Sequence, residues 1–186
     1  MLKLLKKQII EEKLAVSLTL VSEFPLSYYS GMLPGAVSKL YKNEDIMVWL
    51  EPVTKWCNAE WIQKRVCKIV GSENKIYTED GTVIDYDVLA INVGSKTKDT
   101  QSAKGVWEHG LTTRPINDLL PKIEKKENEL LAKNIVPKVV ICGAGASGTE
   151  LSMAFKARWS KFFGKDIEVT LVGPYDTPLQ GTFKTT

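Results

Sequence analysis

Three glycines with a fixed spacing, Gly143, Gly145 and Gly148, form the pattern in this chain that most directly predicts chemistry. In a G-x-G-x-x-G motif the first glycine permits a tight turn, the second lets a pyrophosphate approach the backbone, and the third lets a helix pack closely on a strand. Backbone N–H groups at the start of the helix then face the anion. The motif predicts a dinucleotide-binding turn, and the alternative is a tight turn without a ligand.

The segments on either side of this motif are those that a dinucleotide-binding turn requires. Residues 138–142 are typical of a buried strand, residues 149–163 of a helix, and residues 167–172 of a second buried strand. This order predicts a βαβ unit. The acid that would bind the ribose of NAD is expected at the end of the second strand. Asp176 is a weak candidate at this strand end, or else a turn residue, and no arginine occurs at the strand end. The choice between NADH and NADPH therefore stays open.

The rest of the chain alternates between helix and strand patterns. Apolar residues three and four positions apart predict an amphipathic helix, packed on a sheet, at the start of the chain. A second helical pattern covers 115–134, and we expect a domain boundary near Pro137. Short apolar runs separated by turns predict an antiparallel meander. The meander strands are expected at 65–70, 75–78 and 82–93, after a buried strand at 16–21 and a shaped loop at 28–41.

Two apolar segments of the chain resemble each other, Ser17–Phe24 and Glu168–Tyr175, and each follows a helical pattern. If both are second strands of βαβ units, each should be preceded by a glycine turn at the same distance. A turn that precedes the first segment as the glycine motif precedes the second would lie before Met1. The alternative is that two short buried strands are alike by composition alone. A nucleotide-binding half normally continues with further strand and helix units, so we expect the chain to be truncated at both ends.

Three segments carry a resemblance to a known family: Tyr29–Gly35, Asp80–Ser95 and Gly143–Glu150. Together they resemble the type II NADH dehydrogenase-like branch of the pyridine nucleotide-disulfide oxidoreductases, particularly the relatives of the form fused to selenide, water dikinase. The resemblance implies an α/β fold with two dinucleotide-binding domains. Residues 1–136 would be part of a Rossmann-like FAD domain with an antiparallel meander, lacking its first strand and glycine loop. Residues 137–186 would begin an inserted NAD(P)-binding Rossmann domain.

The same resemblance implies which residues approach the cofactors, FAD and NAD(P)H. The segment Tyr29–Gly35, which includes Pro34, would lie beside the flavin ring, Val66 would offer a backbone contact near the adenine, and the turn Gly94–Ser95 would approach the FAD. Glu150 matches an acid that these proteins place on the helix facing the nicotinamide. Its alternative role is that of a first-turn glutamate favoured by the helix dipole.

The implied reaction is hydride transfer from NAD(P)H to FAD and then to an acceptor such as a quinone, in which the cofactors do the chemistry. No catalytic side chain is required. Cys57, Cys67 and Cys142 show neither a redox pair nor a zinc-binding spacing, so electrons would leave by the flavin alone. His109, the only histidine, is expected on a surface loop. Two alternatives stay open: a non-catalytic fragment or pseudoenzyme, and a nucleotide-binding module without flavin or redox turnover.

Composition excludes several other classes of protein. The net charge of +3 comes from scattered basic and acidic residues, which disfavours a nucleic-acid surface. Apolar runs do not approach the roughly 20 residues that cross a bilayer. We expect a soluble, cytoplasmic protein, with an organelle or a membrane surface as the alternative location and a homodimer as a candidate assembly.

Overall fold

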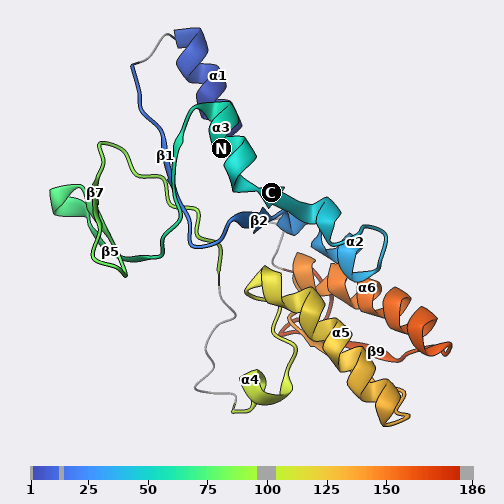
Figure 1. The fold of residues 1–186 in the computed structure, drawn as a ribbon. Helices are drawn as coiled ribbons and strands as arrows, with labels where there is room; N and C mark the ends of the chain where they lie inside the picture. The colour runs from blue at the N-terminus through green and yellow to red at the C-terminus, as the bar shows by residue number, and fades with distance from the viewer. Residues whose placement is uncertain (1, 13–14, 96–103, 181–186) are drawn as a thin grey trace. The chain divides into compact units, whose positions relative to one another are not determined.

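The computed structural model describes residues 2–12, 15–95 and 104–180, and these divide into two compact units (Figure 1). Unit 1 comprises the segment up to Ser27 together with Met47–Val93. Unit 2 comprises Tyr28–Ile46 together with the chain from Gly94 onward. Among the helices of the described ranges, none combines the length and apolar character needed to cross a membrane.

Unit 1 contains helices α1 (Leu2–Glu12) and α3 (Leu50–Cys57) and two small sheets. The expected amphipathic helix is therefore present, but it packs mainly against α3 rather than on a sheet. Lys6 of α1 donates to the backbone carbonyl of Trp56 and lies 4.2 Å from the centroid of its ring. The two sheets pair β1 with β4 in parallel and β2 with β3; their bounds are β1 (Thr19–Val21), β2 (Leu26–Tyr28), β3 (Met47–Trp49) and β4 (Glu60–Ile62).

The expected meander is present in unit 1 as three antiparallel strands, β5 (Val66–Val70), β6 (Lys75–Thr78) and β7 (Val83–Asp85), with the 3-10 turn η3 (Gly71–Glu73) between the first two. The third strand is much shorter than the expected 82–93. Its last residue pairs with Lys75, where β6 begins, so the backbone beyond it meets the turn instead of a partner strand. Gly94 therefore lies in no strand, and Val88 and Val93 are 89% and 87% exposed.

Asp80 fixes the turn between β6 and β7. Its carboxylate accepts hydrogen bonds from the Thr78 hydroxyl and from the backbone N–H of Thr82, and Lys64 lies 2.7 Å from its other oxygen. The bond from Lys64, followed by those from the two threonines, holds the pKa of Asp80 well below its usual value. These contacts stabilise the ionised carboxylate and the turn that it closes.

Unit 2 contains the expected βαβ unit: β8 (Val139–Cys142), α6 (Ala146–Phe163) and β9 (Val169–Val172), with the two strands parallel and in continuous register. Helix α5 (Ile116–Ala132) matches the helix expected at 115–134. The remaining elements are η1 (Ser30–Met32), α2 (Leu33–Val37), η2 (Glu44–Ile46) and α4 (Val106–His109). The shaped loop at 28–41 thus contains a short helix, and His109 is exposed at the end of another.

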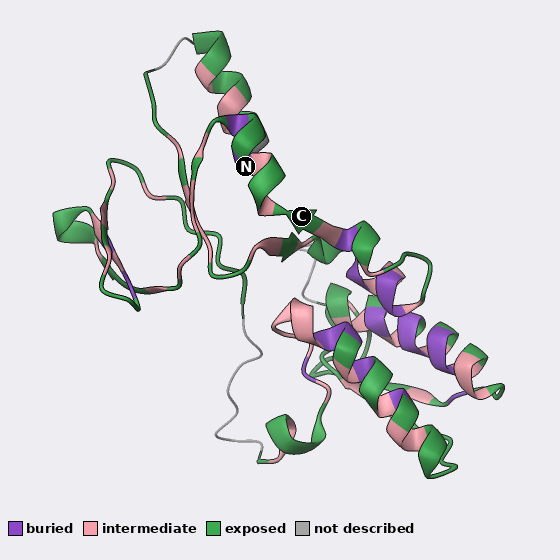
Figure 2. Ribbon diagram, viewed as in Figure 1, coloured by how far each residue is buried: buried purple, intermediate pink, exposed green. Residues whose placement is uncertain are grey.

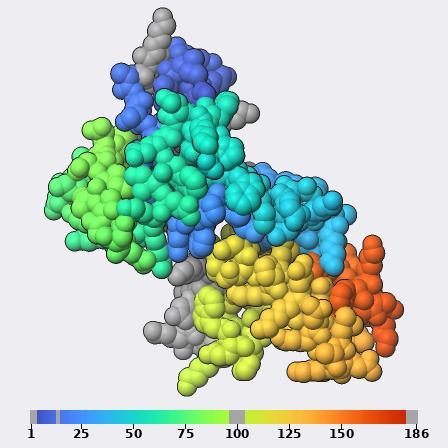
Figure 3. All heavy atoms as spheres, in the orientation of Figure 1, coloured from blue at the N-terminus to red at the C-terminus, as the bar shows by residue number. Residues whose placement is uncertain are grey.

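A single apolar cluster in unit 2 joins α2, α5 and α6, whose facing sides are buried (Figure 2). On α6 the buried apolar residues after Leu151 lie three, four and eight positions further on, at Ala154, Phe155 and Trp159, which is the stripe of a helix packed on one side. In the space-filling view the atoms of α5, yellow to orange, lie beside the orange-red atoms of the later part of unit 2 (Figure 3). Unit 2 therefore includes residues on both sides of Pro137, and the division at 136 and 137 stays a prediction.

Candidate functional site

The turn between β8 and α6, residues Gly143–Gly148, is called the glycine turn below. Gly143 has φ +115°, a backbone conformation that favours glycine, and its N–H donates to the carbonyl of Val172 at 2.7 Å. The helix begins at Ala146, three residues earlier than expected, because Gly145 has the extended conformation of an N-cap. No side chain caps this end of α6. Its first N–H groups are therefore available to an anion.

The other two glycines of the motif have different surroundings. A Cβ added at Gly148, in the first turn of α6, would overlap the carbonyl oxygen of Gly143 and lie 3.6 Å from Cδ1 of Leu171. A Cβ added at Gly145 would meet no heavy atom within 4 Å. The structure therefore shows the close contact of helix and strand that the third glycine permits, and open space over the second, where a ligand would approach.

Gly173, which the sequence analysis did not single out, also contacts the glycine turn. A Cβ added there would overlap that of Ala144 and lie 3.3 Å from its backbone nitrogen. The N–H of Leu179 donates to the carbonyl of Ala144 at 2.8 Å. The segment 173–179, with the exposed weak candidate Asp176, thus starts and ends at the glycine turn. A glycine directly after the second strand of a βαβ unit was the feature that could have revealed this contact.

A cavity of about 160 Å³ within unit 2, called the α2–α6 pocket below, lies between the start of α2 and the start of α6. It is lined by Ser30, Gly31, Leu33, Pro34, Thr113, Arg114, Ser147, Glu150 and Leu151. The pocket brings together Pro34 and Glu150, two candidate residues from distant parts of the chain. Ligand pockets typically hold ≈ 300–1,000 Å³, so this cavity has room for part of a dinucleotide only.

Arg114 is a pocket residue that no sequence motif indicated, since it lies in an irregular segment before α5. It lines the pocket with Glu150, which is exposed in the second turn of α6, so the walls carry both signs of charge. A basic and an acidic group in one pocket lining can orient a polar ring by hydrogen bonds without requiring a net ligand charge. Only the folded chain brings the two residues together.

The other candidate residues lie outside this pocket. Tyr29 is 60% exposed, and its N–H donates to the carbonyl of Ile46 at 2.8 Å. Gly94 has φ +70° in open surroundings, and Ser95 beside it is exposed. Val66 is the first residue of β5 in unit 1. Their contacts with FAD stay predictions.

The three cysteines are all free: Cys57 is buried, and Cys67 and Cys142 are exposed. Cys142 immediately precedes the glycine turn, and its Cα pairs in register with that of Val172. Within the described ranges, no group of three or more histidine, cysteine or acidic side chains could hold a metal ion.

Comparison with known proteins identifies related sequences and folds. A family model described as pyridine nucleotide-disulphide oxidoreductase matches residues 8–185. The sulfide-quinone reductase of Aquifex aeolicus (strain VF5) is 30% identical over 129 residues, which are 69% of this chain and 29% of that protein. The solved sulfide:quinone oxidoreductase of Aquifex aeolicus aligns with TM-score 0.57 and 27% identity, over 76% of this chain and 31% of that one.

Two further solved structures share the fold at lower identity. NDH2 from Plasmodium falciparum, solved in complex with NADH, aligns with TM-score 0.70 and 20% identity over 91% of this chain and 39% of that one. A ferredoxin reductase from Rhodopseudomonas palustris aligns with TM-score 0.70 and 18% identity over 97% and 42%. The chain thus spans between about three tenths and four tenths of the length of these relatives.

Proposed function

Because the chain belongs to the pyridine nucleotide-disulphide oxidoreductase family, we propose that it forms part of an enzyme in which hydride passes from NAD(P)H to a flavin. The expected family and its flavoprotein fold class are confirmed. The expected cofactors, FAD and a nicotinamide dinucleotide, are those of this family, and we propose flavin-dependent oxidation and reduction as the general class of reaction. The observation that carries the proposal is the α2–α6 pocket, which joins Pro34 and Glu150.

The glycine turn would hold the pyrophosphate of the nicotinamide dinucleotide. The uncapped N–H groups at the start of α6 and the positive end of its dipole favour an anion at this place. The open space over Gly145 lets that anion reach the backbone. Both features belong to the backbone, so the turn can bind a phosphate group without a charged side chain.

The α2–α6 pocket would hold the nicotinamide next to residues 29–35, the segment expected beside the flavin. The bound cofactors supply the hydride chemistry when they are present. Pro34 and Leu33 form an apolar wall that excludes water, while Glu150 and Arg114 orient the ring from the polar side. Residues on α2 and α6 thereby hold the two reactants in one orientation, which accelerates a reaction between them.

We further propose the domain division expected from the sequence, with residues 1–136 as part of the FAD-binding domain, without its first strand and glycine loop, and residues 137–186 as part of the NAD(P)-binding domain. The order of the motifs supports this division: the meander comes first, and the βαβ unit with the glycine turn follows α5.

As the final electron acceptor we propose a quinone. The name of the Aquifex aeolicus relative, sulfide-quinone reductase, supports this choice, and the three free cysteines show no spacing of a redox pair. A cytoplasmic location and association into a homodimer stay predictions.

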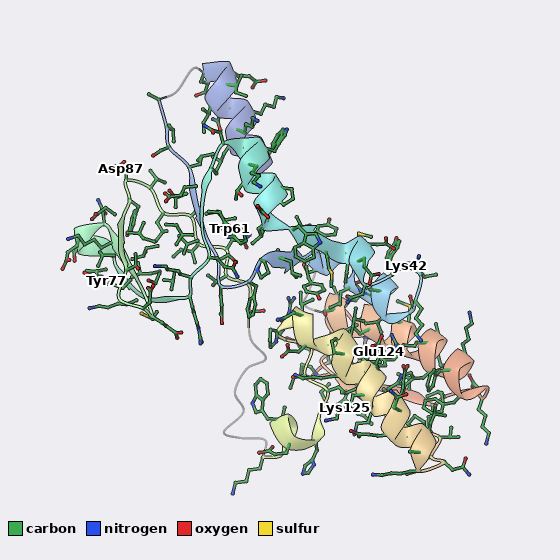
Figure 4. All side chains as sticks on the ribbon, viewed as in Figure 1. Lys42, Trp61, Tyr77, Asp87, Glu124 and Lys125 are labelled. Atoms are coloured by element: carbon green, nitrogen blue, oxygen red, sulfur yellow. The ribbon has the colours of Figure 1, made fainter. Side chains whose placement is uncertain are left out.

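Replacing Glu150 by glutamine tests the pocket. With FAD bound and oxygen excluded, NADH is expected to reduce the flavin about tenfold more slowly in this variant, since one charge-assisted hydrogen bond of ~1.4 kcal/mol is weakened. The loss of flavin absorbance after rapid mixing measures the rate. The matched control is Glu124→Gln on the exposed face of α5 (Figure 4), which should leave the rate unchanged.

Two outcomes would contradict the proposal in different ways. A rate unaffected by Glu150→Gln would assign that residue to the helix dipole alone. A chain that binds NADH but takes up no flavin and shows no reduction would instead be a nucleotide-binding module.

A further inference from the structure

A buried ion pair connects two helices of unit 2. The side chains of Arg158 on α6 and Glu127 on α5 are only 2% and 3% exposed. Arg158 donates from Nε to Oε1 of Glu127 at 2.6 Å and from Nη2 to Oε2 at 2.8 Å. The two parallel bonds match the planar geometries of a guanidinium and a carboxylate, which makes the pair orientation-specific.

Arg158 occupies a position where the sequence pattern of α6 calls for an apolar residue. It lies seven positions after Leu151 and three after Phe155, and therefore on the buried stripe of the helix. Removing two charges from water is costly, and well-packed apolar residues in place of a buried pair are often equally or more stabilising. Stability alone is therefore a weak explanation for this pair.

A third hydrogen bond gives the pair a different role. Nη1 of Arg158 donates to the backbone carbonyl of Val37 at 3.2 Å. Val37 is the last residue of α2, and the carbonyls at a helix end lack partners within the helix. Arg158 thus links the carboxyl end of α2 to α6, while Glu127 holds the guanidinium in the required orientation.

The opposite end of α2 lines the α2–α6 pocket through Leu33 and Pro34, where it faces Ser147 and Glu150 of α6. At about 1.5 Å per residue, Arg158 lies roughly 12 Å along α6 from Glu150. Helix α2 therefore has a polar contact with α6 at its carboxyl end and lines the pocket together with α6 at its other end.

We propose that Arg158 and Glu127 are positioning residues, which fix α2 on α6 so that the pocket keeps a constant distance between residues 29–35, expected beside the flavin, and α6, expected beside the nicotinamide. The contact that fixes α2 on α6 forms without a ligand. Its consequence for hydride transfer rests on the proposed function.

The double variant Arg158→Met with Glu127→Leu separates positioning from stability. Either single substitution leaves a buried charge unpaired and destabilises the fold strongly, whereas the double variant replaces the pair by apolar groups. We expect the double variant to melt within a few degrees of the wild type. Amide hydrogen exchange without nucleotide should accelerate about tenfold over residues 30–38 and stay unchanged in β8 and β9, because the bond to Val37 is lost.

The control is the partly exposed pair Lys126–Glu129 on α5, replaced by Met and Leu, which should leave exchange in α2 unaltered. With FAD and NADH bound, the Arg158→Met, Glu127→Leu variant should reduce its flavin about tenfold more slowly while its NADH dissociation constant stays within about twofold. Unchanged exchange in α2 would overturn the proposal and leave the pair a purely structural role. A wild-type chain that binds no NADH would overturn the proposed function instead, without affecting the exchange result.

Discussion

Substitution of Gly148 by alanine is expected to lower the free energy of unfolding by about 3 kcal/mol, at the upper end of the range for overpacking a core. The added methyl group would overlap the carbonyl oxygen of Gly143, which belongs to the backbone and cannot rotate away. Helix propensity acts in the opposite direction, since alanine is favoured over glycine by about 1 kcal/mol within a helix. The steric term exceeds that gain, so the net effect is destabilising.

Urea denaturation followed by circular dichroism measures this effect. Gly164→Ala is a useful comparison, because Gly164 ends α6 with φ +63° and an added Cβ meets no atom within 4 Å. Its substitution should cost only about 1 kcal/mol from backbone strain. A Gly148→Ala variant as stable as the wild type would mean that α6 does not pack this closely on the end of β8.

Substitution of Gly145 by alanine is expected to leave the fold intact and to weaken NADH binding at least tenfold. Its φ of −77° suits any L-residue, and an added Cβ has open space. Stability should therefore stay equal or rise by ~0.4–1 kcal/mol, as the unfolded chain loses freedom. The methyl group would, however, occupy the space where the pyrophosphate approaches the backbone.

Isothermal titration with NADH, together with a thermal melt, checks both halves of this expectation. A stable variant with unchanged affinity would show that no phosphate lies over Gly145. A variant that loses stability as well as affinity would make the binding result uninformative about the ligand, and would contradict the open geometry at this position.

Features that depend on local backbone chemistry were predicted well from the sequence. The βαβ unit and the conformation of Gly143 follow from residue types within a short segment, and the structure has both. The start of α6 was placed too late because Gly145, which the motif reserves for the ligand, also serves as the N-cap. The third meander strand was predicted too long, because its apolar pattern continues beyond Asp85. Asp85 pairs with Lys75, the first residue of the antiparallel strand β6, so the residues after Asp85 have no partner in that strand.

Features that depend on long-range packing could not be predicted in this way. Arg114 has no motif around it, and its place in the α2–α6 pocket results from the folding of unit 2. Arg158 interrupts an apolar stripe, but the sequence does not reveal which carboxylate pairs with it. Gly173 was overlooked because its close contact, Ala144, lies in the other loop of the same unit.

The central claim is that the glycine turn and the α2–α6 pocket bind one nicotinamide dinucleotide. Amide hydrogen exchange of the chain with and without saturating NADH tests it most directly. The account predicts protection over residues 144–150 and at the start of α2, with none in the meander, and less of this protection in Gly145→Ala when both proteins are compared at an NADH concentration equal to the wild-type dissociation constant. Unchanged exchange over 144–150, or protection confined to the meander, would contradict it.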